Sequence, residues 1–359
     1  MREYARWLAA HGVIRFGAKR AAAAGDPQAM LVADPATRAN PTPVYEKLRA
    51  TAPLVKTRIS NITVHHRVAF DLLRSDDFRV TQLGATLPGP LRWIEEHTRS
   101  GALHPILPPS LLSVEPPDHT RYRKLVSSVF TARAVKKMRD QVQETADALL
   151  DELSDGSPVV DIVDRYCARL PVAVIGRILG VPEEDNQRVL EFGEMAAPSL
   201  DIGLSWSQFK QVERGLIGFD AWLSQHIAGL RRNPGDDLMS QLIAAEDEGI
   251  GLNDEELRAT AGLVLAAGFE TTVNLLGSGI QLLLDHPDQL AVLQQDPSHW
   301  PTAVDEMLRM ESPVQLTARM AKRDVEVEGV TVHEGKLVVL VLAGANRDPL
   351  VFEDPNRFD

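Results

Sequence analysis

Ala266-Ala267-Gly268-Phe269-Glu270-Thr271-Thr272 is the most informative stretch of this chain, because it places an acid and two hydroxyls inside an otherwise apolar helix. At the start of that helix, Asn253 and Glu256 have the spacing of a capping box. Apolar residues then recur at helical spacing until Pro287. The pattern predicts a helix of about 30 residues and roughly 45 Å, long enough to cross a whole domain.

This central segment has two interpretations. A carboxylate buried in such a helix is costly unless it is paired or used. The Thr271 hydroxyl can bond back to the carbonyl of Ala267, which loosens the helix, and Gly268 lets a large group lie against the backbone. The segment is therefore either part of a core helix with a satisfied Glu270–Thr271 pair, or a helix that carries protons to a ligand lying on it.

The composition is that of an ordinary globular protein. The chain has 359 residues, of which 44% are hydrophobic and 25% charged, so it can bury a large core. Its net charge of −12 argues against nucleic acid as a partner. The single Cys167 excludes an intrachain disulfide and predicts a cytoplasmic protein. The longest charge-free runs, Ser100–Val114 and Thr271–Leu284, are too short to predict a transmembrane segment, and we expect no signal peptide.

Most of the remaining segments have helical periodicity, and extended structure is sparse. We expect strands at Leu54–Thr57 and Ile62–Val64, and a hairpin from Val325 to Leu342 that turns at His333-Glu334-Gly335. The fold class predicted is mainly α with a small β region.

The chain shows no internal repeat and no long linker. We expect an N-terminal extension over residues 1–40 that forms an amphipathic helix, followed by a single domain over residues 41–359. Residues Arg133–Leu153 read as one helix, whereas Thr81–Val114 has little regular pattern and is a candidate lid.

Two pairs of charged residues stand at helical spacing. Glu306 and Arg309 lie three apart on one helical face, which alone is typical of a surface pair. His119 and Arg123 lie four apart and form a two-pronged clamp for an anion, to which Arg319 can add a third cation. Each pair alone is unspecific, but the order of these motifs along the chain is specific.

In that order, these motifs resemble the cytochrome P-450 family, specifically its soluble bacterial members, from about Asn40 to Asp359. The resemblance implies the fold of that family and a haem b cofactor. It implies that Glu270 and Thr271 deliver protons to iron-bound dioxygen, and that Ala267 and Gly268 flank the oxygen groove.

The same resemblance assigns the charged pairs. It makes His119, Arg123 and Arg319 ligands of the haem propionates. It makes Glu306 and Arg309 a buried core pair, with Arg357 as the usual third member.

The axial ligand is the point of departure from the family pattern. The family holds its haem iron with a Cys thiolate in a loop about two dozen residues beyond the position of Arg357, whereas this chain stops at Asp359. Cys167 lies in a helical segment, where a buried inert thiol is expected. We therefore expect a C-terminally incomplete haem-thiolate enzyme that lacks the Cys-ligand loop and last helix, holds no metal ligand, and is inactive by itself.

The function implied for the full-length parent is insertion of one oxygen atom from dioxygen into an apolar organic substrate, with electrons from NAD(P)H through a small redox partner. Candidate pocket walls are Thr81–Val114, Met195–Ser207 and Val314–Leu316. One alternative is a peroxide-driven oxygenase, which the Glu270–Thr271 pair argues against. Another is a truncated, haem-free remnant without catalysis.

A docking face for an acidic, ferredoxin-type redox partner is also predicted. Between residues 121 and 139 the chain carries seven basic and no acidic residues. They are Arg121, Arg123, Lys124, Arg133, Lys136, Lys137 and Arg139. The alternative is a solvated helix face with no partner.

Overall fold

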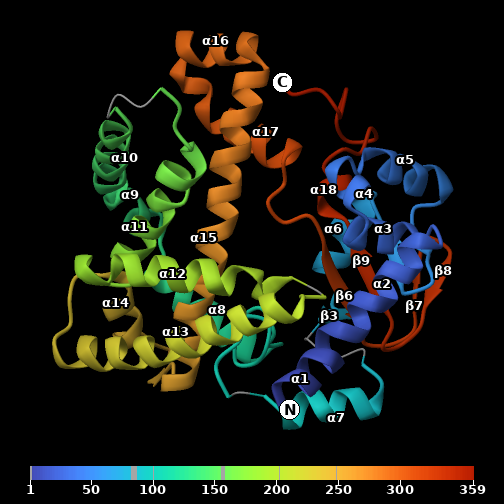
Figure 1. Ribbon diagram of the computed structural model, residues 1–359, viewed down its shortest axis with the longest axis horizontal. Helices are drawn as coiled ribbons and strands as arrows, with labels where there is room; N and C mark the ends of the chain where they lie inside the picture. The colour runs from blue at the N-terminus through green and yellow to red at the C-terminus, as the bar shows by residue number, and fades with distance from the viewer. Residues whose placement is uncertain (1, 82–86, 100, 155–157, 202, 248) are drawn as a thin grey trace. The chain divides into compact units, whose positions relative to one another are not determined.

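The computed structural model describes residues 2–81, 87–99, 101–154, 158–201, 203–247 and 249–359. It is mainly helical with small sheets, as the sequence predicts (Figure 1). The chain divides into two compact units, one made of residues 1–11 and 82–274 and the other of residues 12–81 and 275–359.

The first unit is almost entirely helical. Its helices are α1 (Arg2–Trp7), η1 (Leu8–Gly12), α7 (Gly89–His97), α8 (Asp118–Val129), α9 (Ala132–Lys137), α10 (Arg139–Leu153), η2 (Val163–Cys167), α11 (Arg169–Ile178), η3 (Glu183–Asp185), α12 (Asn186–Ala196), η4 (Ala197–Leu200), α13 (Trp206–Arg232), α14 (Leu238–Ala244) and most of α15 (Asp254–Asp285). A two-stranded ribbon, β4 (Glu246–Asp247) with β5 (Ile250–Gly251), precedes α15.

The core of this unit surrounds α15. Leu257, Ala261 and Leu265 of α15 are almost completely buried among apolar side chains of α8, α11, α12, α13 and α14. Helices α12 and α13 run side by side (Figure 1). They approach closely because α13 has glycines at the contact: a Cβ on Gly215 would lie 2.6 Å from the Cβ of Met195.

The start of α15 confirms the capping box. The Asn253 side-chain oxygen accepts hydrogen bonds from the backbone N–H groups of Glu255 and Glu256, both at 3.0 Å. The Glu256 carboxylate in turn accepts the backbone N–H of Asn253 at 2.9 Å. The helix has 32 residues, close to the length predicted. By length and composition alone α15 would also be long and apolar enough to cross a membrane, a property it shares with core helices of soluble proteins.

The second unit combines helices with a mixed sheet. Its helices are α2 (Val13–Ala23), α3 (Pro27–Ala33), α4 (Pro35–Ala39), α5 (Thr42–Thr51), α6 (His66–Arg74), the end of α15, α16 (Pro287–Gln295), η5 (Pro297–His299), α17 (Trp300–Met310) and α18 (Leu342–Ala345). Its strands are β1 (Val55–Lys56), β2 (Asn61–Thr63), β3 (Phe78–Val80), β6 (Thr317–Ala321), β7 (Val325–Val327), β8 (Val330–Val332) and β9 (Leu337–Leu340).

Five of these strands form one sheet in the order β1-β2-β9-β6-β3, in which β2 and β9 are parallel and the other pairs antiparallel. Side chains alternate between its faces. Val338 and Leu340 join one buried apolar cluster, whereas Val339 and Val341 join another. The sheet is therefore covered on both faces.

The hairpin predicted between Val325 and Leu342 is wrong in its pairing. Strands β7 and β8 pair with each other through a tight turn at Glu328 and Gly329, which have φ values of 50° and 76°. Strand β9 pairs with β2 and β6 instead. The alternating valines are compatible with pairing to either strand. A local sequence pattern cannot identify a partner strand that lies 277 residues away.

Three other segments differ from their sequence prediction. The described residues of the expected N-terminal extension form a series of helices between Arg2 and Ala39, because Asp26 and Asp34 cap new helices at the Asp-Pro steps before α3 and α4. The helix predicted over Arg133–Leu153 is interrupted at Met138, between α9 and α10. The candidate lid contains α7, and its residues 82–86 and 100 lie outside the described residues.

Candidate active site

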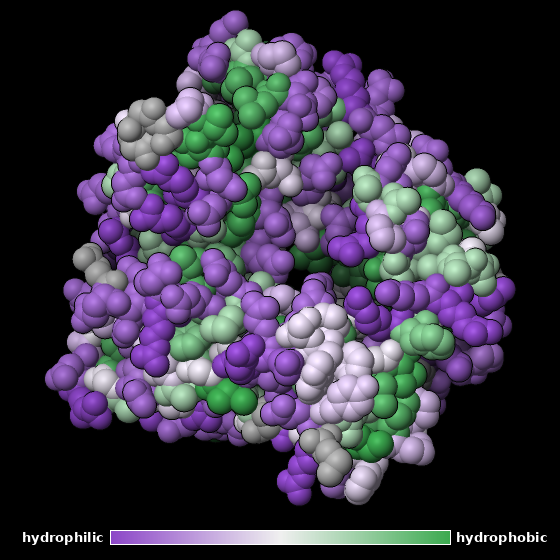
Figure 2. Space-filling model, in the orientation of Figure 1, coloured by the Kyte–Doolittle hydropathy of each residue, from purple (hydrophilic) through white to green (hydrophobic). Residues whose placement is uncertain are grey.

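Helix α15 presents an apolar surface that the described residues leave partly uncovered. In the most apolar 18-residue stretch of this helix, 28% of the residues are buried. Leu265 and Phe269 face the core, whereas Ala267 is exposed and Gly268 half-buried. Figure 2 shows hydrophobic residues at the surface over the upper part of α15 and over α16. An apolar helix face of this kind needs a cover, and a flat apolar group fits it.

The predicted hydrogen bond from Thr271 to the backbone is present, although α15 stays a continuous α-helix through this turn. The Thr271 hydroxyl donates a hydrogen bond to the Ala267 carbonyl oxygen at 2.5 Å. This bond ties the hydroxyl to the exposed side of the helix and competes with the regular backbone bond at that turn. Gly268 has a different neighbour from the one expected, because the space beside its Cα is filled by Ile175 of α11, whose Cδ1 would lie 3.0 Å from an added Cβ.

Glu270 is a half-buried acid without a described hydrogen-bond partner. Burial raises the pKa of its carboxyl above the ordinary value, and the nearby charge of Asp201 raises it further. The satisfied Glu270–Thr271 pair is therefore not what the structure contains. Glu270 instead holds a proton at higher pH than a solvated glutamate does, which is the property required of a proton donor.

The anion clamp is partly assembled on α8. His119 and Arg123 lie one turn apart on this helix, His119 half-buried and Arg123 exposed, and the described part of the chain offers neither an ion-pair partner. Arg319 lies on β6 of the second unit, where its Nη1 donates to the Ala318 carbonyl at 3.0 Å. Its role toward a propionate stays a prediction.

Arg121 is wrongly included in the predicted docking face. Its guanidinium forms an ion pair with Glu256 at 2.6 Å, donates to the Gly251 carbonyl at 3.1 Å and lies over the ring of Tyr122. The Tyr122 hydroxyl donates to the same carboxylate at 2.8 Å. Arg121 therefore fastens α8 to the start of α15.

The pKa values in this cluster follow from the same contacts. Burial, together with the hydrogen bond to Glu256, raises the pKa of Tyr122 to about 12. Burial alone would raise the pKa of Glu256, but hydrogen bonds from Arg121, the Asn253 backbone and Tyr122 bring it below its ordinary value. The sequence indicated the capping role of Glu256 but carried no signal for its contact with residues about 135 positions earlier.

The other basic residues of the docking face are exposed. They are Arg123 and Lys124 on α8, Arg133, Lys136 and Lys137 on α9, and Arg139 at the start of α10. Val135 of α9, 56% exposed, lies among them. A basic surface with an apolar residue in its middle is typical of docking sites for acidic proteins.

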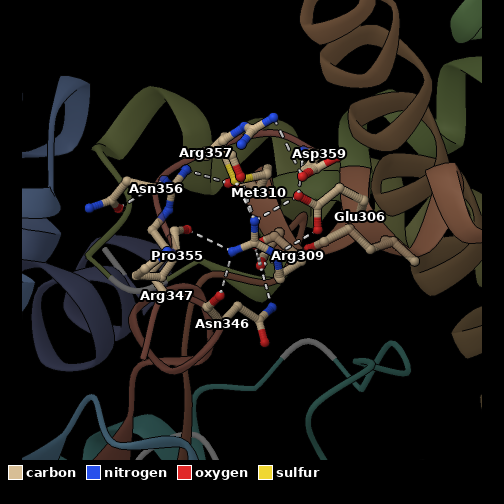
Figure 3. A network of polar contacts seen from close by, with 11 residues as sticks. Glu306, Arg309, Met310, Asn346, Arg347, Pro355, Asn356, Arg357 and Asp359 are labelled. Atoms are coloured by element: carbon tan, nitrogen blue, oxygen red, sulfur yellow. Dashed lines mark hydrogen bonds and ion pairs between the residues drawn. The ribbon is translucent and has the colours of Figure 1, made fainter. Parts of the chain in front are cut away.

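Glu306 and Arg309 of α17 form the core pair that the sequence predicted. Arg309 donates Nε and Nη2 to the two oxygens of Glu306 at 2.6 and 2.7 Å (Figure 3). Its Nη1 donates to the backbone carbonyls of Asn346 and Pro355 at 3.0 and 2.7 Å. Both side chains are largely buried, so every charge is satisfied inside the unit.

Arg357 is wrong as the third side chain of this network. Its backbone carbonyl accepts from Arg309 Nη2 at 2.9 Å, whereas its own guanidinium is exposed and lies 3.7 Å from Asp359 (Figure 3). The Asp359 backbone N–H completes the network by donating to Glu306 at 3.0 Å. Three residues from this segment, Pro355, Arg357 and Asp359, thus contribute main-chain atoms, which no residue-type pattern indicates.

Cys167 is buried in the π-helical turn η2, and burial raises the pKa of its thiol. A thiol in this environment is a poor nucleophile and a poor metal ligand. Within the described ranges, no group of three or more His, Cys, Asp or Glu side chains is arranged to hold a metal ion.

Comparisons with known proteins all lead to one family. A family model described as "Cytochrome P450" matches residues 203–299 and 301–359. The putative cytochrome P450 140 of Mycobacterium bovis is 58% identical over all of this chain and 83% of its own length. The 6-deoxyerythronolide B hydroxylase of Saccharopolyspora erythraea is 43% identical over 68% of this chain and 59% of its length. Among solved structures, P450BioI in complex with a fatty-acid-ligated acyl carrier protein superposes with a TM-score of 0.79 at 31% identity, covering 90% of this chain and 82% of that one.

Proposed function

The chain belongs to the cytochrome P450 family of haem monooxygenases, and we propose that its full-length parent inserts one oxygen atom from dioxygen into an apolar organic substrate, with electrons from NAD(P)H delivered by an acidic redox carrier. The observation that carries this proposal is the middle of α15, where an acid with a raised pKa and a hydroxyl bonded to a helix carbonyl are adjacent on an apolar, partly uncovered helix. The single buried cysteine also supports a cytoplasmic location.

The residues on this face of α15 and on α8 fit a haem. The exposed face of α15 around Ala267 offers an apolar surface for the ring, and His119 and Arg123 on α8 offer cations to a propionate. When bound, haem supplies the activation of dioxygen. Cys167 is not suited to hold the iron, because its thiol is buried and has a raised pKa.

Glu270 and Thr271 supply the protons in this proposal. Glu270 stays protonated at higher pH than a solvated glutamate, so it can release a proton where the reaction needs one. The Thr271 hydroxyl accepts a proton at Oγ1 and passes on the one that it now shares with the Ala267 carbonyl.

The test of the reaction is an isotope experiment on the haem-loaded enzyme. With NADPH, ferredoxin and ferredoxin reductase under 18O2, we expect cyclododecane to give cyclododecanol that carries one 18O atom. Oxygen derived from water would contradict the proposal. Equal turnover with hydrogen peroxide in place of NADPH and ferredoxin would favour the peroxide-driven oxygenase.

The redox partner is proposed to dock on the exposed basic residues of α8, α9 and α10 around Val135. Charge reversal in Lys136→Glu/Lys137→Glu should slow reduction by ferredoxin about tenfold at low salt. The difference should vanish as the Debye length falls from about 10 Å at 0.1 M to about 3 Å at 1 M salt. Stopped-flow reduction measures both.

Lys19→Glu/Arg20→Glu on α2 is the matched control, because it reverses two neighbouring exposed cations outside the docking face. It should leave the second-order rate near that of the wild type. Equal slowing by both double variants would show that net charge, rather than this face, sets the rate.

A further inference from the structure

A cavity of about 180 Å³ lies in the first unit, away from the α15 segment around Thr271. It is lined by the N-terminal helices α1 and η1, the loop that follows α7, and α13. Apolar lining residues include Leu103, Leu107, Leu204, Phe209 and Leu216. The charged and polar lining residues come from segments about 100 and 200 positions apart, so no local motif indicated this site.

Both guanidinium groups of the cavity wall are paired with carboxylates, and Glu255 is a third acid in the lining. Arg6, only 6% exposed, forms an ion pair with Glu213 of α13. Arg99 donates to both oxygens of Glu95 at 2.9 and 2.7 Å. With each guanidinium matched to a carboxylate, the wall has no spare positive charge to attract an anion.

Two histidines of the wall are neutral and have a fixed tautomer. The Nδ1 atom of His11 accepts the backbone N–H of Leu204, and that of His104 accepts the backbone N–H of Ile106, both at 3.4 Å. A backbone N–H can only donate, so the ring proton of each histidine lies on Nε2. Burial lowers the pKa of both to about 4, and nearby cations contribute.

Two N–H donors of this wall have no described acceptor. Within the described part of the chain, Nε2 of His11 and Nε2 of His104 form no hydrogen bond, whereas Nε of Arg6, also unpaired, is sealed inside the protein and does not reach the cavity. A ligand that offers an oxygen to the two histidines therefore gains a hydrogen bond inside a partly apolar cavity.

The cavity continues into apolar space toward α15. A second, smaller cavity shares Leu103, His104 and Leu216 with the first and is lined further by Leu265 and Ala266. Ala266 lies one helical turn before Glu270. Polar donors at one end and apolar walls toward the reactive helix define a ligand with one oxygen group and a hydrocarbon body.

We propose that this cavity binds a neutral carbonyl oxygen of an otherwise apolar molecule, a ketone, lactone or amide, through His11 and His104. The inference rests on the proposed function, since it names the class of substrate that enters the site. A neutral oxygen fits because the wall offers neutral donors and no spare positive charge, whereas a carboxylate would be left without a counter-ion. The N-terminal helices α1 and η1 are thus part of substrate recognition.

The test compares three probes of equal carbon number: cyclododecanone, cyclododecane and dodecanoate. Binding to the 359-residue chain is followed by tryptophan fluorescence, because Trp7 and Trp206 pack against the same cluster as Leu204 and Phe209. We expect the ketone to bind about tenfold more tightly than the alkane, the size of one buried hydrogen bond. Equal affinity of ketone and alkane, or tighter binding of dodecanoate than of the ketone, overturns the proposal.

Two variants locate the donors. His104→Phe keeps the ring and removes the N–H, so the ketone preference should fall to about twofold or less, and His11→Phe should act in the same direction. His97→Phe is the control, because His97 is an exposed histidine on α7 that does not line the cavity. An unchanged preference in both cavity variants, with the far-ultraviolet spectrum of the wild type, shows that these histidines do not bind the carbonyl.

The outcomes separate this inference from the proposed function. Loss of ketone preference while cyclododecane is still hydroxylated removes the carbonyl site alone. Retained ketone preference with oxygen derived from water in the product removes the proposed reaction alone.

Discussion

Glu306 and Glu270 are acids on two helices of this molecule, and their surroundings are opposite. Glu306 accepts two hydrogen bonds from Arg309 and one from the Asp359 backbone, and Arg309 is itself held by backbone carbonyls. Glu270 has no described hydrogen bond, and burial raises its pKa. An acid whose bonds are all used fixes the fold, whereas an acid left without bonds is available for proton transfer. The acids look alike in sequence and differ only in their neighbours.

The proton-transfer side of this comparison predicts the largest effect. Thr271→Ala should keep substrate binding but lower the rate of product formation roughly 10²–10⁴-fold, the usual contribution of a positioned proton donor. Electrons from NADPH should then leave as hydrogen peroxide. Product and peroxide per NADPH measure this, with Thr271→Ser as the control that retains the hydroxyl. A wild-type product ratio in the alanine variant would remove Thr271 from the proton route.

The structural side predicts a loss of stability. Arg309→Leu should destabilise the protein by about 3–5 kcal/mol, because it leaves the buried Glu306 charge without its partner. Arg357→Ala should change the stability by no more than about 0.5 kcal/mol, because its side chain is exposed and only its carbonyl joins the network. Chemical denaturation compares the two. Equal losses would mean that the Arg357 side chain belongs to the network after all.

Glu270 predicts a small effect with a definite sign. Its folded-state pKa is raised above the ordinary 4.5, so its stabilising contribution is complete below that value and is lost as pH rises through the folded pKa. Glu270→Gln should therefore melt above the wild type by on the order of 1 °C at pH 7 to 8, and match it near pH 4. Melting curves across this range are the measurement. A variant that is less stable at pH 8 would indicate that Glu270 has a favourable partner there.

Cys167, like Glu306, is held inside the protein, and we expect its replacement to leave the haem spectrum unchanged. Residues 1–359 with added haemin, reduced under carbon monoxide, should show no thiolate-type Soret band, and Cys167→Ser should give the same spectrum. The thiol is buried and its pKa is raised, so it offers no thiolate to the iron. A thiolate band that disappears in the serine variant would reverse this assignment.

The features that could be predicted from the sequence are contacts between residues that lie close together along the chain. The capping box at Asn253, the bond from Thr271 to Ala267 and the pairing of Glu306 with Arg309 all join residues no more than four positions apart. Residue type and helical spacing are sufficient for such contacts.

What the sequence missed depends on distant partners. The anchoring of Arg121 by Glu256 and the pairing of β9 with β2 join residues 135 or more positions apart. Main-chain acceptors are hidden for a different reason, because the carbonyls of Asn346, Pro355 and Arg357 that hold Arg309 would be offered by any residue. The cavity beside Arg6 could not be predicted for both reasons: its lining residues are distant in sequence, and backbone N–H groups bind its histidines.

The parallel pairing of β2 with β9 also bears on the order of events during synthesis. Asn61 of β2 meets Val338, which leaves the ribosome 277 residues later. At about 5–20 residues per second, that interval lasts roughly 15–55 seconds. The stretch 82–274 is continuous and is complete while residues 12–81 still await their partner strand. We therefore expect protease protection to arise first in 82–274 during translation, with the early segment held as an unpaired strand edge in the meantime.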